Sequence, residues 1–369
     1  MARAAVAEGD ARPSVPPRSE RQGWCAKPLR GRDGGSYGET DGATHLRLAP
    51  SGPATLVLPD VQALRLSTDR EVLALRRSPR PAWASAMGRD RYGLWAEIAI
   101  EGPGGSQVVQ RLRWIPPGCF LMGSPDDEPE RLDYEGPRHV VTIETGYWLF
   151  DTVCSQALWI ALLGENPSRF QDPDRPVERV SWQDMHEGFL PALNSRIPGF
   201  ALPSEAQWER ACRAGTETAL YSGPIEVLGD LDAPALDPIA WYGGNSGVNY
   251  DLEEGDDSTK GWWIKRHKQY DHVMAGTRKV KHKAPNPWGL YDMLGNVWGW
   301  VEDSGGATYE GAPTDGSVRQ TDAVGVNRVI RGGSWYGGAR VCRCACRIDA
   351  PPDYRLDYLG FRCARVQDR

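Results

Sequence analysis

Alternation of hydrophobic and polar residues predicts short β-strands in the first third of the chain. Between His45 and Arg77 the runs HLRLAP, ATLVLP and VLALRR alternate and end at turn residues, and GLWAEIAIEG at 93–102 continues the pattern. We expect residues 43–104 to form a small β-rich N-terminal module. Residues 1–42 show no periodicity and are rich in Ala, Arg, Pro, Ser and Gly, which predicts a disordered segment.

Helical periodicity is found at three places in residues 105–369, which we expect to form a second domain. QALWIALLG follows Ser155, a residue type that caps helix N-termini, and ends at a glycine. WQDMHEGFL follows Ser181, and Ser204 has capping-box spacing to Gln207 ahead of WERACRAG. Glycine, proline, asparagine and aromatic residues dominate the sequence beyond these helices, so the rest of the domain should consist of loops and short strands.

The composition is typical of a soluble, loop-rich globular protein. Of the 369 residues 40% are hydrophobic and 25% charged, and the 42 glycines, 29 prolines and 15 tryptophans suggest that order comes from turns and aromatic anchors. No apolar run approaches the roughly 18 residues of a membrane-spanning helix, and the N-terminus lacks the apolar core of a signal peptide. We therefore expect a cytoplasmic protein with no membrane partner.

The charge distribution argues against a general nucleic-acid surface, because the net charge is −6. A basic stretch from Lys265 to Lys283 is the exception. It is typical of a solvated loop, and binding of an anionic ligand is the alternative. Two acidic stretches, SPDDEPERLDYE at 124–135 and DLEEGDD at 251–257, lack the spacing of an EF-hand and are also typical of solvated loops.

Three cysteines at every second position, Cys342, Cys344 and Cys346, are candidates for a metal site. In a strand they would point to the same side, where thiolates could bind Zn or Cu(I). Arginines are interleaved with them, and no fourth ligand is evident. The chain has no HExxH or CxxC motif and no GxSxG elbow between a predicted strand and a helix, so the sequence offers no established signature of nucleophilic or histidine–metal catalysis.

Separate stretches of residues 110–365 resemble the formylglycine-generating-enzyme (sulfatase-modifying factor) family. They are RWIPPGCFLMGS, GENPSRF, RPVERVSW, LPSEAQWERACRAGT, NPWGLYDMLGNVWGWVED, RVIRGGSW and GFRCAR, and they occur in order through the whole domain. The resemblance implies a C-type-lectin-like fold, which is an irregular, loop-rich α+β domain. This fold hosts both enzymes and binding proteins, so it does not assign a function by itself.

One function implied by the resemblance is that of a copper-dependent formylglycine-generating oxidase. Oxidase members bind copper and activate oxygen with two cysteines that follow the GGS motif. The resemblance implies that the first corresponds to Gly337 and that the second, counted back from GFRCAR, falls at or near Ala339. Some members have a glutamate near a calcium site between two tryptophans, where this chain has Gly299. Oxidase chemistry is therefore the alternative function, and we expect no cofactor, with calcium left open.

The C-terminal segment 331–365 also resembles the variable region of proteins diversified by diversity-generating retroelements. In those proteins a fixed frame holds positions that are templated as asparagine codons and changed at their adenines. The frame residues here would be Arg331–Trp335, Arg340, Arg343, Ala345, Arg347, Pro352, Arg355 and Gly360–Arg362. The variable positions between them would be Tyr336, Gly337, Gly338, Val341, Cys344, Cys346, Ile348, Asp349, Ala350, Tyr354, Leu356, Asp357 and Tyr358.

This second resemblance favours a non-catalytic ligand-binding protein with a diversified recognition surface. Every residue at the variable positions can be reached from an asparagine codon by changing its two adenines. Tyrosines at such positions supply large amphipathic contact area at low entropic cost. We expect these residues to bind a macromolecular ligand, a protein and not a nucleic acid, while the arginine-rich frame keeps the backbone fixed.

Overall fold

The computed structural model describes residues 44–47, 63–67, 72–76, 80–260, 263, 266–321, 323 and 325–366. The segment 1–42, predicted to be disordered, and the predicted strand in ATLVLP lie outside the described residues. Within the described part of the chain, no helix has both the length and the apolar character needed to cross a bilayer.

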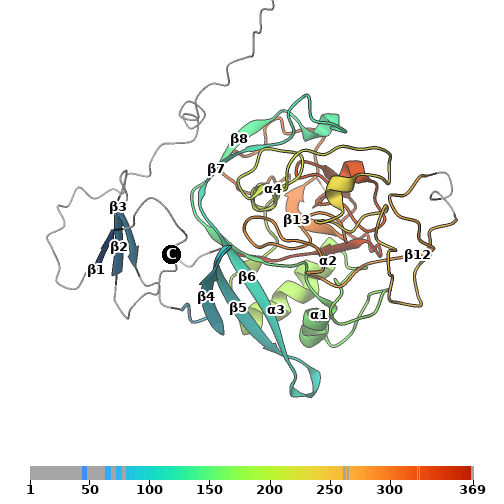
Figure 1. Cartoon of the computed structure of the whole chain (residues 1–369). Helices are drawn as coiled ribbons and strands as arrows, with labels where there is room; N and C mark the ends of the chain where they lie inside the picture. The colour runs from blue at the N-terminus through green and yellow to red at the C-terminus, as the bar shows by residue number, and fades with distance from the viewer. Residues whose placement is uncertain are drawn as a thin grey trace, which may run out of the picture. The chain divides into compact units, whose positions relative to one another are not determined.

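The chain divides into two compact units, Met1–Pro79 and Arg80–Arg369 (Figure 1). In the first unit, strand β1 (Thr44–Arg47) pairs in parallel with β2 (Ala63–Ser67), and β2 pairs antiparallel with β3 (Val72–Arg76). Two of these strands coincide with the alternating runs HLRLAP and VLALRR.

A six-stranded sheet forms one side of the second unit (Figure 1). Its strands, in spatial order, are β10 (Phe200–Ala201), β17 (Ala364–Val366), β9 (Tyr147–Phe150), β6 (Gln107–Ile115), β5 (Gly93–Glu101) and β4 (Ala86–Asp90). Strands β5 and β6 are paired from Trp95 opposite Arg113 to Glu101 opposite Gln107. Residues 86–101 thus belong to the sheet of the second unit, and the boundary between the units lies at 79/80, not at the predicted 104/105.

Helices begin after the three predicted caps, and the helical segment that follows Ser181 continues beyond the predicted stretch to Arg196. They are α1 (Gln156–Leu163), α2 (Trp182–Asp184), the π-helical turn η3 (Met185–Phe189), α3 (Leu190–Arg196) and α4 (Glu205–Arg213). Ser155 Oγ accepts a hydrogen bond from the Leu158 N–H, and the left-handed Gly164 ends α1. Ser204 and Gln207 form the predicted capping box of α4. Helix α1 packs against β5 and β6 (Figure 1).

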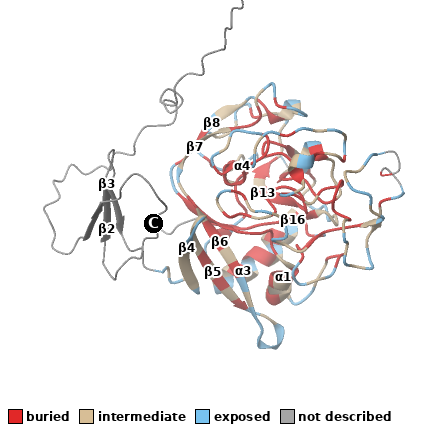
Figure 2. Ribbon diagram, viewed as in Figure 1, coloured by how far each residue is buried: buried red, intermediate tan, exposed pale blue. Residues whose placement is uncertain are grey.

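A second, four-stranded sheet carries the C-terminal segment. Its strands, in spatial order, are β15 (Arg347–Ala350), β14 (Arg328–Arg331), β13 (Trp298–Ser304) and β16 (Leu359–Phe361). This sheet is mixed, because β13 pairs in parallel with β16 and antiparallel with β14. Strands β13 and β16 lie in the buried interior (Figure 2).

Short elements complete the second unit. They are the strand pairs β7 (Gly118–Met122) with β8 (His139–Ile143) and β11 (Asp256–Asp257) with β12 (Met274–Ala275), and the single 3₁₀ turns η1 (Pro103–Gly105), η2 (Asp133–Glu135), η4 (Pro234–Leu236) and η6 (Ala339–Val341). The described chain is mostly β with few helices and much irregular backbone, as the glycine and proline content predicts.

Candidate functional site: the C-terminal segment and its aromatic face

Two buried arginines anchor the C-terminal segment to helix α4. Arg331 donates to Glu209 and, at 2.8 Å, to the carbonyl of Ala345. Arg347 makes a bidentate pair with Glu205, with distances of 2.7 and 2.9 Å. Burial alone would raise the pKa of Glu205, but Arg347 and Arg331 hold that pKa below its ordinary value. The two carboxylates, one turn apart on α4, therefore fix β14 and β15 through charged hydrogen bonds.

A third frame arginine, Arg343, is held by the loop that precedes β8. Its Nη1 donates to Glu135 at 2.8 Å and to Glu128 at 2.5 Å, and its Nη2 donates to the carbonyl of Glu130 at 2.9 Å. The Arg343 side chain is fully buried. The prediction that 124–135 is a solvated loop is therefore wrong for Glu128 and Glu135, which are buried as partners of this arginine.

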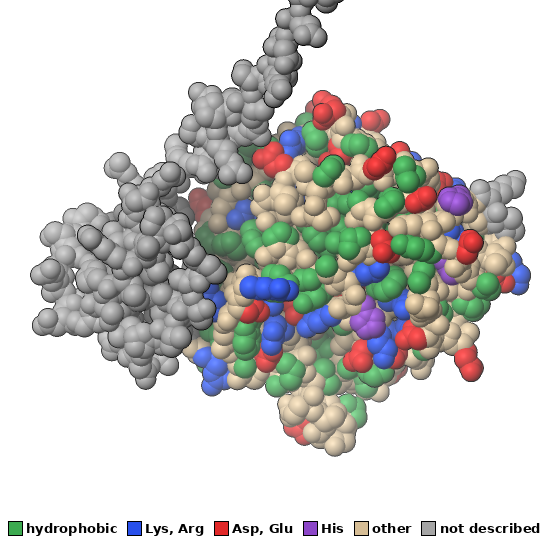
Figure 3. Space-filling model, viewed as in Figure 1, with side chains coloured by type: hydrophobic (Ala, Val, Ile, Leu, Met, Phe, Trp, Pro, Cys, Tyr) green, Lys and Arg blue, Asp and Glu red, His purple; other side chains and the backbone are tan. Residues whose placement is uncertain are grey.

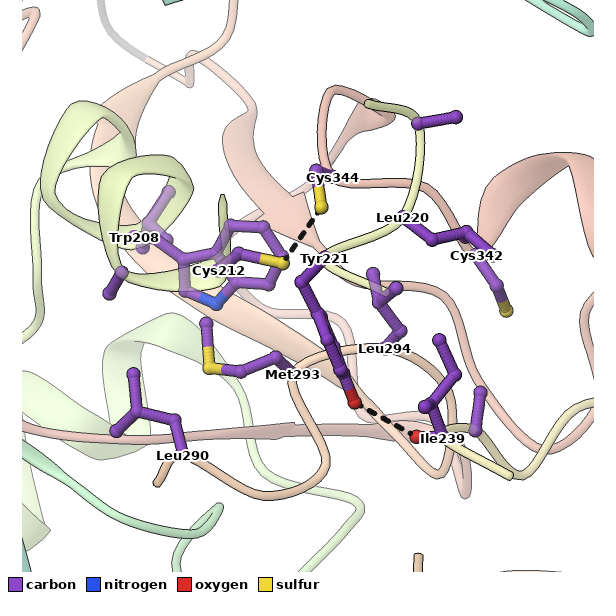
Figure 4. Packing of buried hydrophobic residues seen from close by; sticks show 14 of the residues in the cluster. Trp208, Cys212, Leu220, Tyr221, Ile239, Leu290, Met293, Leu294, Cys342 and Cys344 are labelled. Carbon is purple, nitrogen blue, oxygen red and sulfur yellow. Dashed lines mark hydrogen bonds between the residues drawn. The ribbon is translucent and has the colours of Figure 1, made fainter. Parts of the chain in front are cut away.

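Three positions predicted for the recognition surface lie in the core. Cys344 and Cys346 are 0% exposed, and Cys344 Sγ lies 3.6 Å from Cys212 Sγ of α4 (Figure 4). Ala350 is also buried. The prediction that these side chains belong to a surface is wrong. The cysteine-containing stretch folds as turns, and β15 begins only at Arg347, so side-chain alternation does not apply to the cysteines.

An aromatic cluster lies where the segment meets solvent. The rings of Tyr336 and Tyr358 are stacked, with centroids 5.8 Å apart and planes 9° apart. Trp335, which is fully buried, contacts Tyr336 edge-on at 5.5 Å, and Trp263 does so at 5.3 Å. Both tyrosines are half-buried. The structure thus brings together two predicted positions that are 22 residues apart and supports them on buried tryptophans.

A charged cluster adjoins these rings. The backbone carbonyl of Asp357 accepts a hydrogen bond from Trp335 Nε1 at 2.9 Å, and the Asp357 carboxylate pairs with Arg169 at 2.6 Å. Arg169 also pairs with Asp256 at 2.7 Å and with Glu254 at 3.2 Å. Sequence reasoning missed Arg169, although it lies in the family-like stretch GENPSRF. It also missed Trp263, because nothing in the surrounding sequence indicates contact with a segment 73 residues away.

The remaining variable positions vary in exposure. Tyr354 is 48% exposed. Asp349 is exposed and accepts a hydrogen bond from Asn327 Nδ2 at 2.8 Å. Leu356 and Ile348 are half-buried and pack against the core. A surface side chain is therefore available at only part of the predicted set.

The turn at 337–341, where the resemblance predicts the positions of the oxidase cysteines, is compact. Gly337, Gly338 and Val341 are half-buried, and Ala339 is fully buried with its N–H donating to the Asp230 carbonyl at 2.7 Å. A Cβ atom added to Gly337 would lie 2.9 Å from Val341 Cγ2. A side chain at position 337 would therefore require the turn to shift.

The residues at this turn do not fit a copper–thiolate pair. Gly337 and Ala339 supply no sulfur, and the thiols of Cys342 and Cys346 are buried in the core. Burial raises the pKa of Cys346 to about 12, which disfavours the thiolate that a metal would need. No group of three or more His, Cys, Asp or Glu side chains that could hold a metal ion occurs among the described residues.

The position considered for calcium offers no carboxylate. Gly299 is buried in β13, and an added Cβ would have only Trp208 Nε1 and the Arg331 carbonyl within 4 Å. These neighbours, an N–H donor and one carbonyl, do not make a calcium site.

The basic stretch that was the alternative site is neutralised by carboxylates. Three of its lysines form ion pairs: Lys279 with Asp172 at 3.0 Å, Lys281 with Asp151 at 2.8 Å and Lys283 with Asp237 at 3.4 Å. On the face of the molecule in Figure 3, basic and acidic side chains are interspersed. These pairs leave little excess positive charge for an anionic ligand.

Comparison with known proteins relates the second unit to one family. The family model described as "Sulfatase-modifying factor enzyme 1-like domain" matches residues 103–367. The chain is 30% identical to a formylglycine-generating enzyme of Thermomonospora curvata over 315 residues, which cover 70% of this chain and 94% of the relative. It is 26% identical to a Bos taurus protein named inactive C-alpha-formylglycine-generating enzyme 2, with 74% and 91% covered.

A solved structure shares the fold. Treponema denticola variable protein 1 superimposes with a TM-score of 0.55 and is 26% identical in sequence, and the match covers 70% of this chain and 96% of that protein.

Proposed function

Because the chain belongs to the sulfatase-modifying factor enzyme 1-like family, we propose that it is a ligand-binding member and not an oxidase. The proposal is supported by the glycine and alanine at the two positions where oxidase members have cysteines. It is also supported by the similarity to a variable protein, and by the existence of a relative whose name describes it as inactive. The fold alone does not decide between these functions.

The main support for the proposal is the stacked pair Tyr336 and Tyr358, which lies on a segment held in place by buried arginines of the frame. Three frame arginines, Arg331, Arg343 and Arg347, are buried and bonded to carboxylates, so the backbone beneath the tyrosines is fixed by contacts that the tyrosines do not make. Aromatic side chains in such positions dominate binding energy at protein interfaces. The arrangement therefore suits a protein ligand that contacts the tyrosines.

We further propose that the exposed part of this segment is diversified by a retroelement mechanism. The burial of Cys344, Cys346 and Ala350 removes these three positions from the recognition set. The remaining set is Tyr336, Gly337, Gly338, Val341, Ile348, Asp349, Tyr354, Leu356, Asp357 and Tyr358. A near-copy of the 3′ end of the gene with adenines at these codons, beside a reverse transcriptase gene, is the genomic arrangement this proposal requires.

A pull-down from host lysate tests the binding function. We expect the double variant Tyr336→Ala with Tyr358→Ala to bind the partner at least about tenfold more weakly than the parent does. This change in affinity corresponds to roughly 1.4 kcal/mol of binding free energy. A Lys279→Ala, Lys281→Ala and Lys283→Ala variant serves as the control. Loss of the partner in the lysine variant alone, with its circular dichroism spectrum unchanged from that of the parent, would place the binding site elsewhere and refute the assignment.

A further inference from the structure

The stacked Tyr336 and Tyr358, with the carboxylates around Arg169, form a surface that we call the aromatic face. This face carries more negative charge than Arg169 neutralises. Within the residues that the structure describes, the ion pairs of Asp357, Asp256 and Glu254 are all made with Arg169, whose Nη1 lies 2.6 Å from the first and 2.7 Å from the second. One guanidinium facing three carboxylates leaves a net charge of about −2 at this point. Glu254 is 63% exposed, so part of this charge faces solvent.

Arginines elsewhere in the segment do not offset this charge. Arg355 pairs with Asp184 at 2.7 Å, and Arg340 lies 3.7 Å from Glu130. Both exposed frame arginines thus have carboxylate partners of their own. The negative charge around Arg169 is therefore a local property of the face.

A further carboxylate lies beneath the cluster. Glu178 is fully buried, and its Oε1 accepts a hydrogen bond from the Phe170 N–H at 2.9 Å. Its Oε2 has no hydrogen-bond partner. The Phe170 ring contacts Trp335 at 5.3 Å, which places this unsatisfied oxygen in the layer that supports the aromatic face.

The stacked rings are suited to the same kind of ligand. A ring face of tyrosine attracts cations through its quadrupole, and this attraction is greatest where water is partly excluded. Tyr336 and Tyr358 are both half-buried, and Tyr358 directly follows Asp357 in the chain. The apolar faces and the carboxylates are therefore contiguous.

We propose that the Tyr336–Tyr358 pair and the carboxylates around Arg169 form one face that binds an arginine- or lysine-bearing segment of a protein partner. This inference rests on the proposed binding function and adds the chemistry of the ligand to it. The aliphatic stem and charged head of such a side chain match an aromatic surface beside carboxylates.

The test uses the full chain and two short fluorescent peptides, one of alternating arginine and glycine and one of alternating glutamate and glycine. Fluorescence anisotropy measures binding at about 0.05 M and about 0.5 M NaCl. We expect the arginine peptide to saturate the protein with a Kd at or below about 1 mM at low salt, to bind at least about fivefold more weakly at high salt, and to bind in preference to the glutamate peptide. No binding of the arginine peptide, or a preference for glutamate, overturns the inference.

Variants locate the binding on the face. Glu254→Gln and Asp256→Asn should each weaken binding of the arginine peptide at least about threefold. The control Glu144→Gln removes an equal charge from an exposed position outside the face and should leave the Kd unchanged. Equal loss in the Glu144→Gln control, or unchanged binding in the tyrosine double variant, would show that the peptide binds elsewhere. A partner from lysate that depends on the tyrosines, together with no binding of the arginine peptide, would refute this inference and leave the binding function intact.

Discussion

Arg343 illustrates how single residues separate the fixed part of the C-terminal segment from its exposed part. Its guanidinium is fully buried and bonded to Glu128 and Glu135, while Arg340, three residues earlier, has a side chain that is 44% exposed. Both were predicted as frame residues from the same resemblance. The sequence could not distinguish them, because burial depends on the loop at 124–135, which is far away in the chain.

Replacing Arg343 should therefore unfold the protein far more readily than replacing Arg340. Arg343→Ala leaves two buried carboxylates without their cation, which typically costs about 3–5 kcal/mol. Arg340→Ala removes a solvent-exposed pair and should change stability by less than about 1 kcal/mol. Urea denaturation followed by tryptophan fluorescence measures both. Similar losses in the two variants would contradict the assignment of Arg343 as the anchor.

Glu178 makes stability depend on pH. Burial raises its pKa from an ordinary value of 4.5 to about 8, although backbone N–H groups of Phe170 and Arg169 oppose the shift. The folded state therefore keeps a proton that the unfolded state releases, so Glu178 favours folding below about pH 4.5 and progressively loses this contribution up to about pH 8. Glu178→Gln, which resembles the protonated form, should gain stability relative to the parent across this window, by up to a few kcal/mol.

Unfolding free energies measured for parent and Glu178→Gln between about pH 4.5 and pH 8 check this sign. The difference between the two proteins should grow as pH rises. A constant difference would mean that Glu178 is ionised in the folded state throughout.

At the scale of elements, the sequence predicted the features that depend on neighbouring residues, such as helix caps, but it did not predict which strands pair with each other. The caps at Ser155 and Ser204 are confirmed because capping depends on residues within one turn. The alternating stretch 93–102 does contain a strand, but alternation does not reveal which strand it pairs with, and β5 pairs with β6 of the second unit. The surface position predicted for Cys344 and Cys346 came from the resemblance to variable regions, which does not specify which side chains are buried.

The pairing of β5 with β6 predicts how far the chain can be shortened from its N-terminus without loss of cooperative folding. Residues Ala96, Ile98 and Ile100 of β5 are at most 2% exposed, and burial of each large aliphatic side chain contributes about 1.5–3 kcal/mol. A chain that starts at Arg80 should melt cooperatively. A chain that starts at Ser106, which lacks β4 and β5, should lose cooperative melting in circular dichroism. Cooperative melting of the shorter chain would return the boundary to its predicted place.

At the scale of the whole molecule, family membership and chemistry are separate questions. The matching stretches specify a fold whose core is held by buried arginine–carboxylate pairs and tryptophans, and none of these contacts involves the turn at Gly337 and Ala339. These arginine–carboxylate contacts therefore do not depend on thiols at positions 337 and 339. Many residues along the chain therefore predict the family, whereas the prediction of a binding protein rather than an oxidase depends on positions 337 and 339 alone.

The protein should accordingly lack formylglycine-generating activity even when copper is supplied. The copper-incubated full chain would be mixed with a cysteine-containing sulfatase-motif peptide, and the product examined by mass spectrometry for the aldehyde. We expect no aldehyde above the level obtained without protein, because positions 337 and 339 carry no thiol and burial raises the pKa of Cys342 and of Cys346. The formylglycine-generating enzyme of T. curvata, assayed in parallel, is the positive control.

The double variant Gly337→Cys with Ala339→Cys should also stay inactive. A Cβ at position 337 would lie 2.9 Å from Val341 Cγ2, and Ala339 is fully buried. Two thiols added there would therefore not hold a metal where substrate can reach it. Aldehyde formed by the unmodified chain would show that another group performs the oxidation and would refute the binding-protein assignment.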